Sequence, residues 1–325
     1  MSERLNHLLV LPRLRIQNAN AISSPMTWGF PAMSAFIGAI QALERNLPDE
    51  TRLIFEGVGV VCHRIEPQVT EGGVIKAFHL TRNPVDKSGN TAAIVEEGRA
   101  HLEITLLIGV GSEGEELDSF DSRQALARQI FDQVQGMRIA GGSVMPAMGE
   151  KRYRPELISF DDNEDKRKKQ WNRLRRRLLP GFALVLRDDR LRAHTEALKA
   201  QDANATALDA WLDLSRLNHE CHVTVDENDK QQVEWQVRRP FPGWLVPIPV
   251  GYGAISDLYQ PGEVANARDP NVPFQFVESL YSVGEWVSPH RLRHPDALMW
   301  FVENDIERGV YRLTNDYALT HSIED

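Results

Sequence analysis

The chain has 325 residues, with 37 basic and 46 acidic side chains and a formal net charge of −9. Hydrophobic residues make up 42% and charged residues 26%, which is typical of a globular protein with one large domain or two modest ones. The acidic balance excludes a protein that coats nucleic acid indiscriminately, so any RNA contact must be local.

Membrane and secretory signals are absent from the sequence pattern. No apolar run is long enough to span a bilayer, and the first 15 residues do not resemble a signal peptide. The two cysteines, Cys62 and Cys221, lie far apart and form no CxxC pair, which favours a reducing compartment. We therefore expect a cytoplasmic protein with no membrane contact.

The first predicted element is a strand over residues 7–16, followed by a polar loop over residues 17–31. Alternation predicts that one face of this strand carries Leu8, Val10, Leu14 and Ile16. The same alternation places Arg13 and Arg15 on the other, outward face. Pro12 lacks an amide hydrogen, so a bulge or a strand end is expected there.

The next elements follow in a regular order. Residues 36–47 predict a helix that ends before Pro48, and residues 53–65 predict a strand in which Gly57 and Gly59 allow a close approach by a backbone or a ligand. Residues 99–108 predict a strand with one covered face. Asp121 or Ser122 is expected to cap a helix that has its apolar stripe within 126–134 and ends at Gly136, and residues 138–145 predict a further strand.

The order strand, helix, strand, strand, helix, strand predicts an α+β chain with a ferredoxin-like (RRM-like) core over residues 1–146. Its helices should cover one face of the sheet, and the other face should be free to bind a ligand. Residues 66–98 are expected to form an inserted arm of short strands. Residues 147–220 are expected to form a helical segment, and residues 221–325 an irregular, β-rich region that packs on the core.

The segment LPRLRIQNANAISSP offers RNA-binding chemistry near the N-terminus. Arg13 and Arg15 can bind phosphates, and the following polar side chains can bond ribose hydroxyls and base edges. These side chains are Gln17, Asn18, Asn20, Ser23 and Ser24. The alternative is a polar loop whose Asn and Ser side chains cap its own backbone.

A basic amphipathic helix is expected over residues 166–179. Its apolar stripe is Trp171, Leu174 and Leu178, and its basic side includes Lys169, Arg173, Arg176 and Arg177. This side could meet RNA phosphates, displaced DNA or an acidic partner. It could equally be a solvated face balanced by the acidic residues of 161–165.

The remaining motifs give weaker indications of function. The GxGxxG match at 109–114 is followed by acidic residues that would repel a pyrophosphate, so we expect a loop there. His219, Glu220, Cys221 and His222 fit no metal-ligand spacing, and we expect neither a metal nor a cofactor. His63, His79 or His101 could act as a general base in RNA cleavage, but no neighbouring residue marks one as activated. Trp244 or Tyr252 could stack on a base.

Several strings in the chain resemble a known family. They are LPRLRIQNANAISSPMTWGFP (11–31), HLTRNP (79–84), TAAIVEEGRAHLE (91–103), GGSVMP (141–146), RRLLPGFALV (176–185), PGWLVPIPVGY (242–252) and GEWVSPHR (284–291). In these strings the chain resembles the second subunit of the type I-F CRISPR surveillance complex, a Csy family member equivalent to the Cas-five group. The similarity spans nearly the whole chain and is weakest around 202 and 224–232.

The resemblance implies a non-catalytic subunit with a ferredoxin-like core that binds the repeat-derived 5′ handle of the guide RNA (crRNA). It also implies pairing with the large subunit at the tail of the complex, contact with an adjacent backbone subunit, and target DNA reached through neighbouring subunits. In this type a separate endonuclease matures the guide. The alternative is a metal-independent endoribonuclease of the repeat-associated superfamily that processes repeat RNA.

Within the resembling segments, we expect Arg13, Arg15 and Arg138 to neutralise handle phosphates. Gln17, Asn18, Asn20 and Ser24 are expected to read ribose and base edges, while Gly141 and Gly142 admit the RNA backbone closely. The arm residues Thr81, Arg82 and Asn83 are expected to form a thumb at the junction of handle and spacer.

Overall fold

The computed structural model describes residues 5–48, 51–73, 75–82, 85, 88–91, 94–112, 114–146, 153–225 and 231–321. The chain is α+β, as predicted. The helices are α1 (Met33–Arg45), α2 (Phe120–Val134), α3 (Glu164–Arg177), α4 (Asp188–Lys199), α5 (Ala207–Ser215) and α6 (Tyr317–His321), with short 3-10 turns η1 (Pro289–Arg291) and η2 (Pro295–Leu298).

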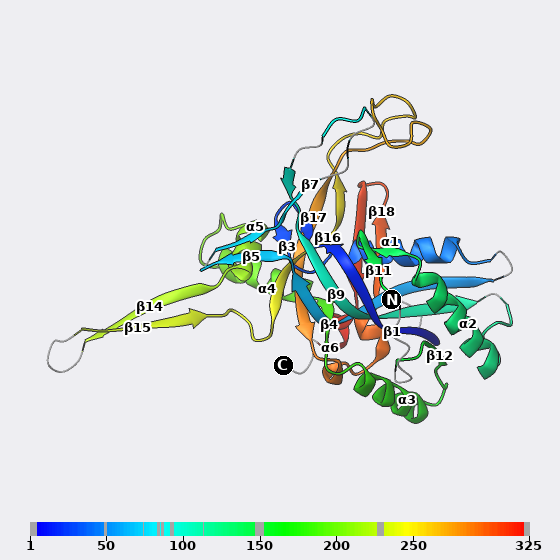
Figure 1. The fold of residues 1–325 in the computed structure, drawn as a ribbon. Helices are drawn as coiled ribbons and strands as arrows, with labels where there is room; N and C mark the ends of the chain where they lie inside the picture. Colours follow the sequence, from blue (N-terminus) through cyan, green and yellow to red (C-terminus); the bar gives the residue numbers. More distant parts are fainter. Residues whose placement is uncertain are drawn as a thin grey trace.

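Strands from all parts of the chain join one antiparallel sheet (Figure 1), which has 11 strands within the described residues. These strands are β1 (His7–Asn20), β4 (Leu53–Pro67), β9 (Arg99–Ser112), β10 (Arg138–Ile139), β11 (Gly142–Val144), β12 (Glu156–Ser159), β13 (Phe182–Leu186), β16 (Leu245–Ala254), β17 (Val277–Val287), β18 (Trp300–Asp305) and β19 (Val310–Asn315). The order is β10-β11-β1-β9-β4-β13-β17-β16-β19-β18, and β12 pairs with the start of β1.

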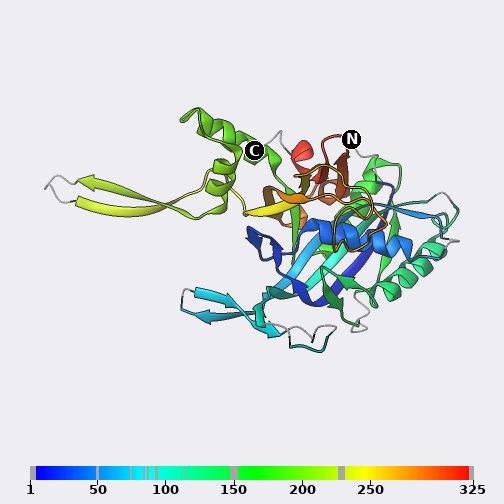
Figure 2. The same cartoon turned by 90° about the horizontal axis from the view of Figure 1, so that it is seen from above.

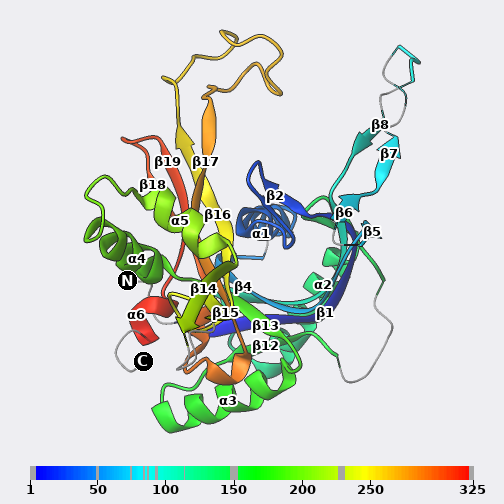
Figure 3. The ribbon, with the colours of Figure 1, turned by 90° about the vertical axis from the view of Figure 1, so that its left-hand side faces the viewer.

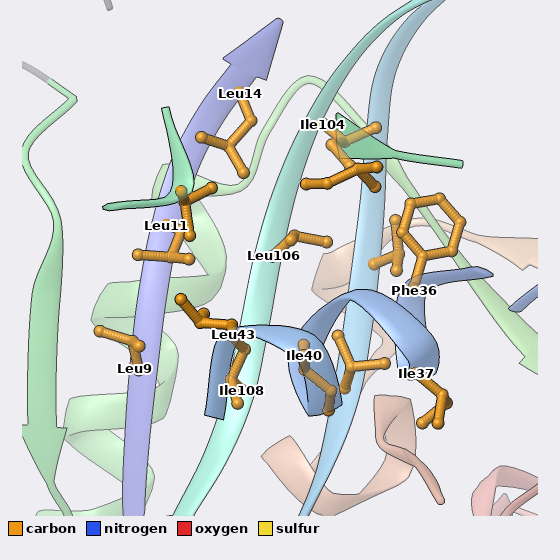
Figure 4. Packing of buried hydrophobic residues seen from close by; sticks show 14 of the residues in the cluster. Leu9, Leu11, Leu14, Phe36, Ile37, Ile40, Leu43, Ile104, Leu106 and Ile108 are labelled. Carbon is orange, nitrogen blue, oxygen red and sulfur yellow. The ribbon is translucent and has the colours of Figure 1, made fainter. Parts of the chain in front are cut away.

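The sheet curls around α1 (Figure 3), so that N-terminal and C-terminal strands face each other across this helix. The apolar side of α1, including Phe36, Ile40 and Leu43, packs into one core with both groups of strands (Figure 4). Trp300 of β18 is fully buried in this core, and its indole nitrogen donates to the Leu184 carbonyl oxygen at 2.8 Å. The predicted helix at 36–47 is therefore confirmed.

The outer face of the sheet is not free along its whole length, so that expectation was wrong. Leu8, Val10 and Leu107 on this face form a second core with Trp171 and with other residues of α3 and η2. Trp171 donates its indole hydrogen to the Leu292 carbonyl oxygen at 2.9 Å. The sequence of the N-terminal strands alone did not reveal this cover, because α3 and η2 come from distant segments.

The bulge predicted at Pro12 is confirmed, and it overturns the predicted alternation in β1. The β1–β9 register shifts between Leu11 and Leu14, with Arg13 at a φ of 52°. The extra residues reverse the two faces. Leu8 and Val10 therefore pack under α3, whereas Leu14 and Ile16 pack under α1 on the opposite side.

Two other local expectations can be compared with the structure. α2 is capped by the Ser119 hydroxyl, which accepts from the Ser122 amide at 3.0 Å, and not by Asp121 or Ser122. The close approach at the two glycines of β4 is confirmed, and the neighbour is the chain itself. A Cβ at Gly57 would lie 2.7 Å from the Trp300 carbonyl oxygen, and one at Gly59 would lie 1.5 Å from Leu298 Cδ1.

The C-terminal region is more regular than expected. Residues 221–325 are expected to be irregular and β-rich, yet they contain β16, an interior strand between β17 and β19 that is buried from Ile248 to Gly251. A strand covered on both faces shows no polar alternation, and Pro247 and Pro249 further concealed it. Register with β17 is kept through a shift between Pro249 and Gly251.

Two groups of paired strands project from the body, and the β5–β6 and β14–β15 pairs point to the same side (Figures 1 and 2). One lies in the predicted arm and contains β5 (Val69–Gly72) paired with β6 (Ile75–Phe78), and β7 (Leu80–Arg82) paired with β8 (Ile94–Glu96). The other is a long hairpin of β14 (Asn218–Val225) and β15 (Gln231–Arg238). A small hairpin, β2 (Ile22–Ser24) with β3 (Thr27–Trp28), lies before α1. None of the described helices is long and apolar enough to cross a bilayer.

Candidate nucleic-acid interface

Beyond the part covered by α3, the outer face of the sheet is polar. Register places Arg15 of β1, Glu103 of β9 and Arg64 of β4 in one row across three adjacent strands. Glu66 of β4 lies opposite His101 of β9 in the next row. Sequence reasoning missed Arg64 as a member of this surface, because a bulge between Cys62 and Arg64 changes which side chains of β4 face outward.

Arg13 is the least available of the predicted phosphate ligands. Its side chain is only 14% exposed and forms an ion pair with Glu103 at 2.7 Å. The guanidinium also lies 5.2 Å from the centre of the Tyr153 ring, and the Arg13 amide donates to the Thr105 hydroxyl. Arg13 therefore lies on the outer face with Glu103, as predicted, but its charge is paired and little of its side chain is exposed.

Arg15 and Arg138 differ from Arg13, because both are exposed and bond only to neutral groups. Arg15 donates to the Pro146 carbonyl oxygen at 3.1 Å, and Arg138 donates through Nε to the Gly141 carbonyl oxygen at 3.1 Å. Within the described part of the chain, neither guanidinium forms an ion pair with a carboxylate. Their positive charge is therefore not neutralised by a described side chain.

A second bulge lies where β1 ends. The register shifts between Ile16 and Ala19, and Asn18 adopts a φ of 58°. The Asn18 amide donates to His101 Nδ1 at 3.3 Å, and its side-chain oxygen accepts from Gln68 Nε2 at 2.6 Å. Bulges and residues at positive φ are concentrated next to binding sites, where they aim side chains. Gln17 and Asn18 are both exposed here.

The local alternative, a polar loop that caps its own backbone, accounts for part of the motif. Asn20 exchanges hydrogen bonds with the backbone of Ile22, at 2.8 Å and 3.1 Å. Ser24 is buried, and its hydroxyl lies 2.6 Å from that of Thr27. Ser23 is likewise bonded to Thr27, at 2.7 Å. These side chains shape the loop before α1, and Ser24 is not on the surface.

The turn between β10 and β11 lies against the end of β1. Ala140 and Gly141 adopt positive φ values of 49° and 76°, and the Ala140 carbonyl oxygen accepts from the Asn20 amide at 2.8 Å. Gly142 is buried, and a Cβ there would lie 2.6 Å from the Ala19 nitrogen. The close approach at Gly142 is therefore made by β1. Gly141 is exposed on the turn.

A groove of about 1060 Å³ lies beside this turn. Asn20, Arg138 and Gly141 line one part of it, and the small side chains of α1, including Ala35 and Ala39, line another. Further lining residues are Arg99, which is ion-paired with Glu97 at 2.7 Å, and Tyr252 and Tyr311. The structure thus brings Asn20, Arg138 and Gly141 together although they are far apart in sequence. Arg99 was not singled out from the sequence, although it lies in the resembling string 91–103.

The predicted basic helix is α3. Its stripe of Trp171 and Leu174 is buried, with Leu178 just beyond its end, as predicted, and Lys169, Arg173, Arg176 and Arg177 are exposed. Arg177 is ion-paired with Glu156, and Lys166 with Asp161 at 3.3 Å. α3 packs on the part of the outer face that lies next to the rows of polar side chains.

In the arm, Thr81 and Arg82 belong to β7, which pairs with β8, and Asn83 lies outside the described residues. The arm is connected to the polar face through Gln68, whose amide nitrogen lies 3.1 Å from His101 Nε2.

His63, one of the predicted candidates for a general base, is held by neighbouring groups. His63 Nδ1 lies 2.7 Å from the Pro180 carbonyl oxygen and Nε2 lies 2.8 Å from the Thr105 hydroxyl, so both ring nitrogens have partners. Burial is the main cause that lowers the pKa of His63. His219 to His222 lie along β14, where side chains alternate between faces. Among the described residues, no group of three His, Cys, Asp or Glu is placed to hold a metal ion.

Comparison with known proteins agrees with the resemblance. The model of the family described as CRISPR-associated protein (Cas_Csy2) matches residues 9–313. The CRISPR-associated protein Csy2 of Pseudomonas aeruginosa (strain UCBPP-PA14) is 49% identical over 322 residues, which cover 97% of each chain. The chain therefore belongs to the Csy2 family of CRISPR-associated proteins.

Proposed function

We propose that this chain is the non-catalytic subunit of a type I-F surveillance complex that holds the 5′ handle of the guide RNA. The exposed cations Arg15 and Arg138 contact handle phosphates, with Gln17, Asn18 and Asn20 beside them. This surface, consisting of those five residues and Gly141, is called the cradle below. Arg13 stabilises this surface through its contacts at the first bulge of β1.

The strand order supports a ferredoxin-like core in residues 1–146. Neighbours in the sheet run β11-β1-β9-β4, all antiparallel, and α1 and α2 contribute to the same core cluster. This is the arrangement expected when two β-α-β units share one sheet. We keep the division into residues 1–146, 147–220 and 221–325 as part of this proposal.

The observation that carries the proposal is the contrast between the paired and the unpaired arginines. Arg13, Arg64 and Arg99 are matched by Glu103, Glu66 and Glu97. Among the described residues, the partners of the Arg15 and Arg138 side chains are carbonyl oxygens. In a chain of net charge −9, Arg138 beside the groove and Arg15 on the bulged strand form a local anion-binding surface.

The test is the double variant Arg15→Gln with Arg138→Gln in the assembled complex. Each lost phosphate contact on single-stranded RNA lowers the salt slope of binding by about 0.7, so we expect a slope that is lower by about 1.4. Arg128→Gln is the matched control, because Arg128 is also exposed and also donates to a carbonyl oxygen, that of Gln124, at 3.0 Å. An unchanged slope in the double variant contradicts the proposal.

We further propose that the large subunit and the adjacent backbone subunit contact this chain, and that target DNA is reached through neighbouring subunits.

The surface of the β14–β15 hairpin supports the proposal that a protein partner binds there. Register places Cys221 opposite Trp235 and Val223 opposite Val233 on one face, and both valines and Trp235 are more than half exposed. An isolated hairpin with an uncovered apolar face has little stability of its own. Trp235→Ser is expected to lower co-purification of the large subunit.

The basic side of α3 is a second candidate surface for RNA, DNA or a partner, through Lys169, Arg173, Arg176 and Arg177. The alternative activity, an endoribonuclease, receives no support from the described histidines, since both ring nitrogens of His63 are engaged in hydrogen bonds.

A further inference from the structure

An apolar pocket of about 460 Å³ lies where the curled sheet divides. β13 pairs with β4 only at Phe182 opposite Cys62 and Ala183 opposite Val61. Beyond this point β4 continues along β9 to Pro67 and forms one wall of the pocket, and β16 and β17 form the opposite wall. The β2–β3 hairpin and the start of α1 complete the lining.

The walls of the pocket are mainly aromatic. Its lining includes Trp28, Phe30, Phe182, Trp244 and Trp286. Trp244 packs against Phe182 and Trp286, with ring centres 5.5 Å and 6.2 Å apart, and Trp286 packs edge-on against Phe30 at 5.0 Å. Despite these contacts Trp244 is 56% exposed, and Trp28 is 55% exposed. Large ring surfaces therefore remain open to a ligand.

The polar groups at the pocket are neutral or already bonded. Burial raises the pKa of the Cys62 thiol to about 12, so this side chain stays protonated. His63 is held by Pro180 and Thr105, and Pro247 and Pro249 have no amide hydrogen to offer. Such a pocket favours a flat ligand that binds through its faces.

The pocket adjoins the cradle. Arg64 belongs both to the pocket lining and to the row that contains Arg15, and Ser23 belongs to the loop that follows β1. Trp28 also lies edge-on to Phe78 of the arm, with ring centres 5.6 Å apart. The aromatic lining comes from four of the segments that carry the family resemblance: 11–31, 176–185, 242–252 and 284–291.

We propose that one base of the bound single-stranded RNA leaves the strand and stacks in this pocket against Trp244 or Trp28. The inference rests on the proposed RNA-binding function and adds a base site to it. Single-stranded RNA is held by unstacked bases on aromatic rings beside cations that hold the phosphates, which is the arrangement found here. A base has the flat apolar faces that the lining accepts, and its phosphates would lie toward Arg15.

The test uses the assembled complex with Trp244→Leu and, separately, Trp28→Leu. Leucine retains apolar bulk and removes the stacking surface. We expect guide RNA affinity to fall by about 5- to 150-fold, the range for one base on one aromatic ring, with the salt slope unchanged. Trp244→Phe is expected to retain most of the affinity. Phe120→Leu is the control, because Phe120 is an exposed aromatic residue on α2, outside the pocket.

A second measurement locates the base directly. Guide RNA containing 5-iodouridine is assembled into the complex and irradiated, and crosslinked peptides are identified by mass spectrometry. We expect crosslinks at Trp28 or Trp244 in the wild type and their loss in the matching leucine variant. Thermal unfolding of each variant complex shows whether the fold is retained.

The outcomes separate the base site from the cradle. If Arg15→Gln with Arg138→Gln lowers the salt slope while both leucine variants bind RNA as tightly as the wild type, the base site is refuted and the cradle stands. If neither set affects binding, both proposals fail. If Trp244→Leu releases a protein subunit and the remaining complex keeps its RNA affinity, a protein segment fills the pocket and the base site is refuted.

Discussion

Replacing Asp213 with asparagine should loosen the base of the β14–β15 hairpin. Asp213 lies at the end of α5, and its side chain is only 8% exposed. It accepts from His194 Nε2 at 2.7 Å, from Arg216 at 2.8 Å and from Arg238 at 2.8 Å, with Asn218 at 3.1 Å. Asn218 and Arg238 are the first and last residues of the hairpin, so one carboxylate ties both strands to α4 and α5.

The magnitude follows from the exposure of each partner. The Arg216 side chain is 67% exposed, so its pair contributes close to nothing, and Arg238, at 35% exposure, contributes about 0.5–1 kcal/mol. The His194 side chain is 7% exposed, and a buried hydrogen bond to a charged group contributes about 1.5–3 kcal/mol. We therefore expect Asp213→Asn to lower the free energy of unfolding by about 2–4 kcal/mol.

The pH dependence has a definite sign. Burial raises the pKa of Asp213, but hydrogen bonds from Arg238, His194 and Arg216 outweigh burial and hold this pKa well below its usual range. A carboxyl whose folded pKa is lowered contributes stability that is present above the unfolded pKa of about 3.9 and is lost as the pH falls below it. Asp213→Asn should therefore remove part of the acid sensitivity of the wild type.

The assay is denaturant unfolding at neutral pH together with amide hydrogen exchange in residues 218–225 and 231–238. Faster exchange in the hairpin is expected for Asp213→Asn. Asp257→Asn, which changes an exposed carboxylate in a loop, is the control. If stability and hairpin exchange match the wild type in both variants, the carboxylate does not hold the hairpin and the reasoning is refuted.

Further predictions concern glycines and thiols. Gly142→Ala should lower stability by about 1–3 kcal/mol by forcing β11 away from β1, because its Cβ would lie 2.7 Å from the Gln17 carbonyl oxygen. Gly38→Ala in α1, with no atom within 4 Å of its Cβ, should raise stability by about 0.5–1 kcal/mol, and equal unfolding midpoints for the two variants would contradict both expectations. Cys221 is exposed and should react with iodoacetamide at pH 8. Cys62 is buried and its pKa is raised to about 12, so it should stay unmodified in the native protein. Mass spectrometry of both cysteine-containing peptides checks the two expectations.

Much of the local structure could be predicted from the sequence. Residues 99–104 alternate between polar and apolar side chains, and this part of β9 has the same alternation in its burial, whereas every residue from Ile104 to Val110 is buried. The stripe of Trp171 and Leu174 predicted the buried side of α3, and Pro12 predicted the first bulge. Each of these features depends on residues close together in the chain, so their periodicity and turn chemistry suffice.

The candidate site was predicted less completely. Residue type identified Arg13, Arg15 and Arg138, but only the fold shows that Arg13 is paired with Glu103 and that the other two are not. The second bulge at Asn18, and the approach of Gly142 to β1, follow from register between strands and leave no local signal.

The sequence by itself determined the family, the α+β class and the residue types that can bind RNA, because these depend on local patterns and on long matching strings. The tertiary structure decided how β16 enters the sheet, how α3 covers part of the outer face, and how Trp28, Phe182, Trp244 and Trp286 meet in one pocket. These features arise from contacts between segments far apart in the chain, where burial on both faces of a strand removes the alternation that a sequence pattern can reveal.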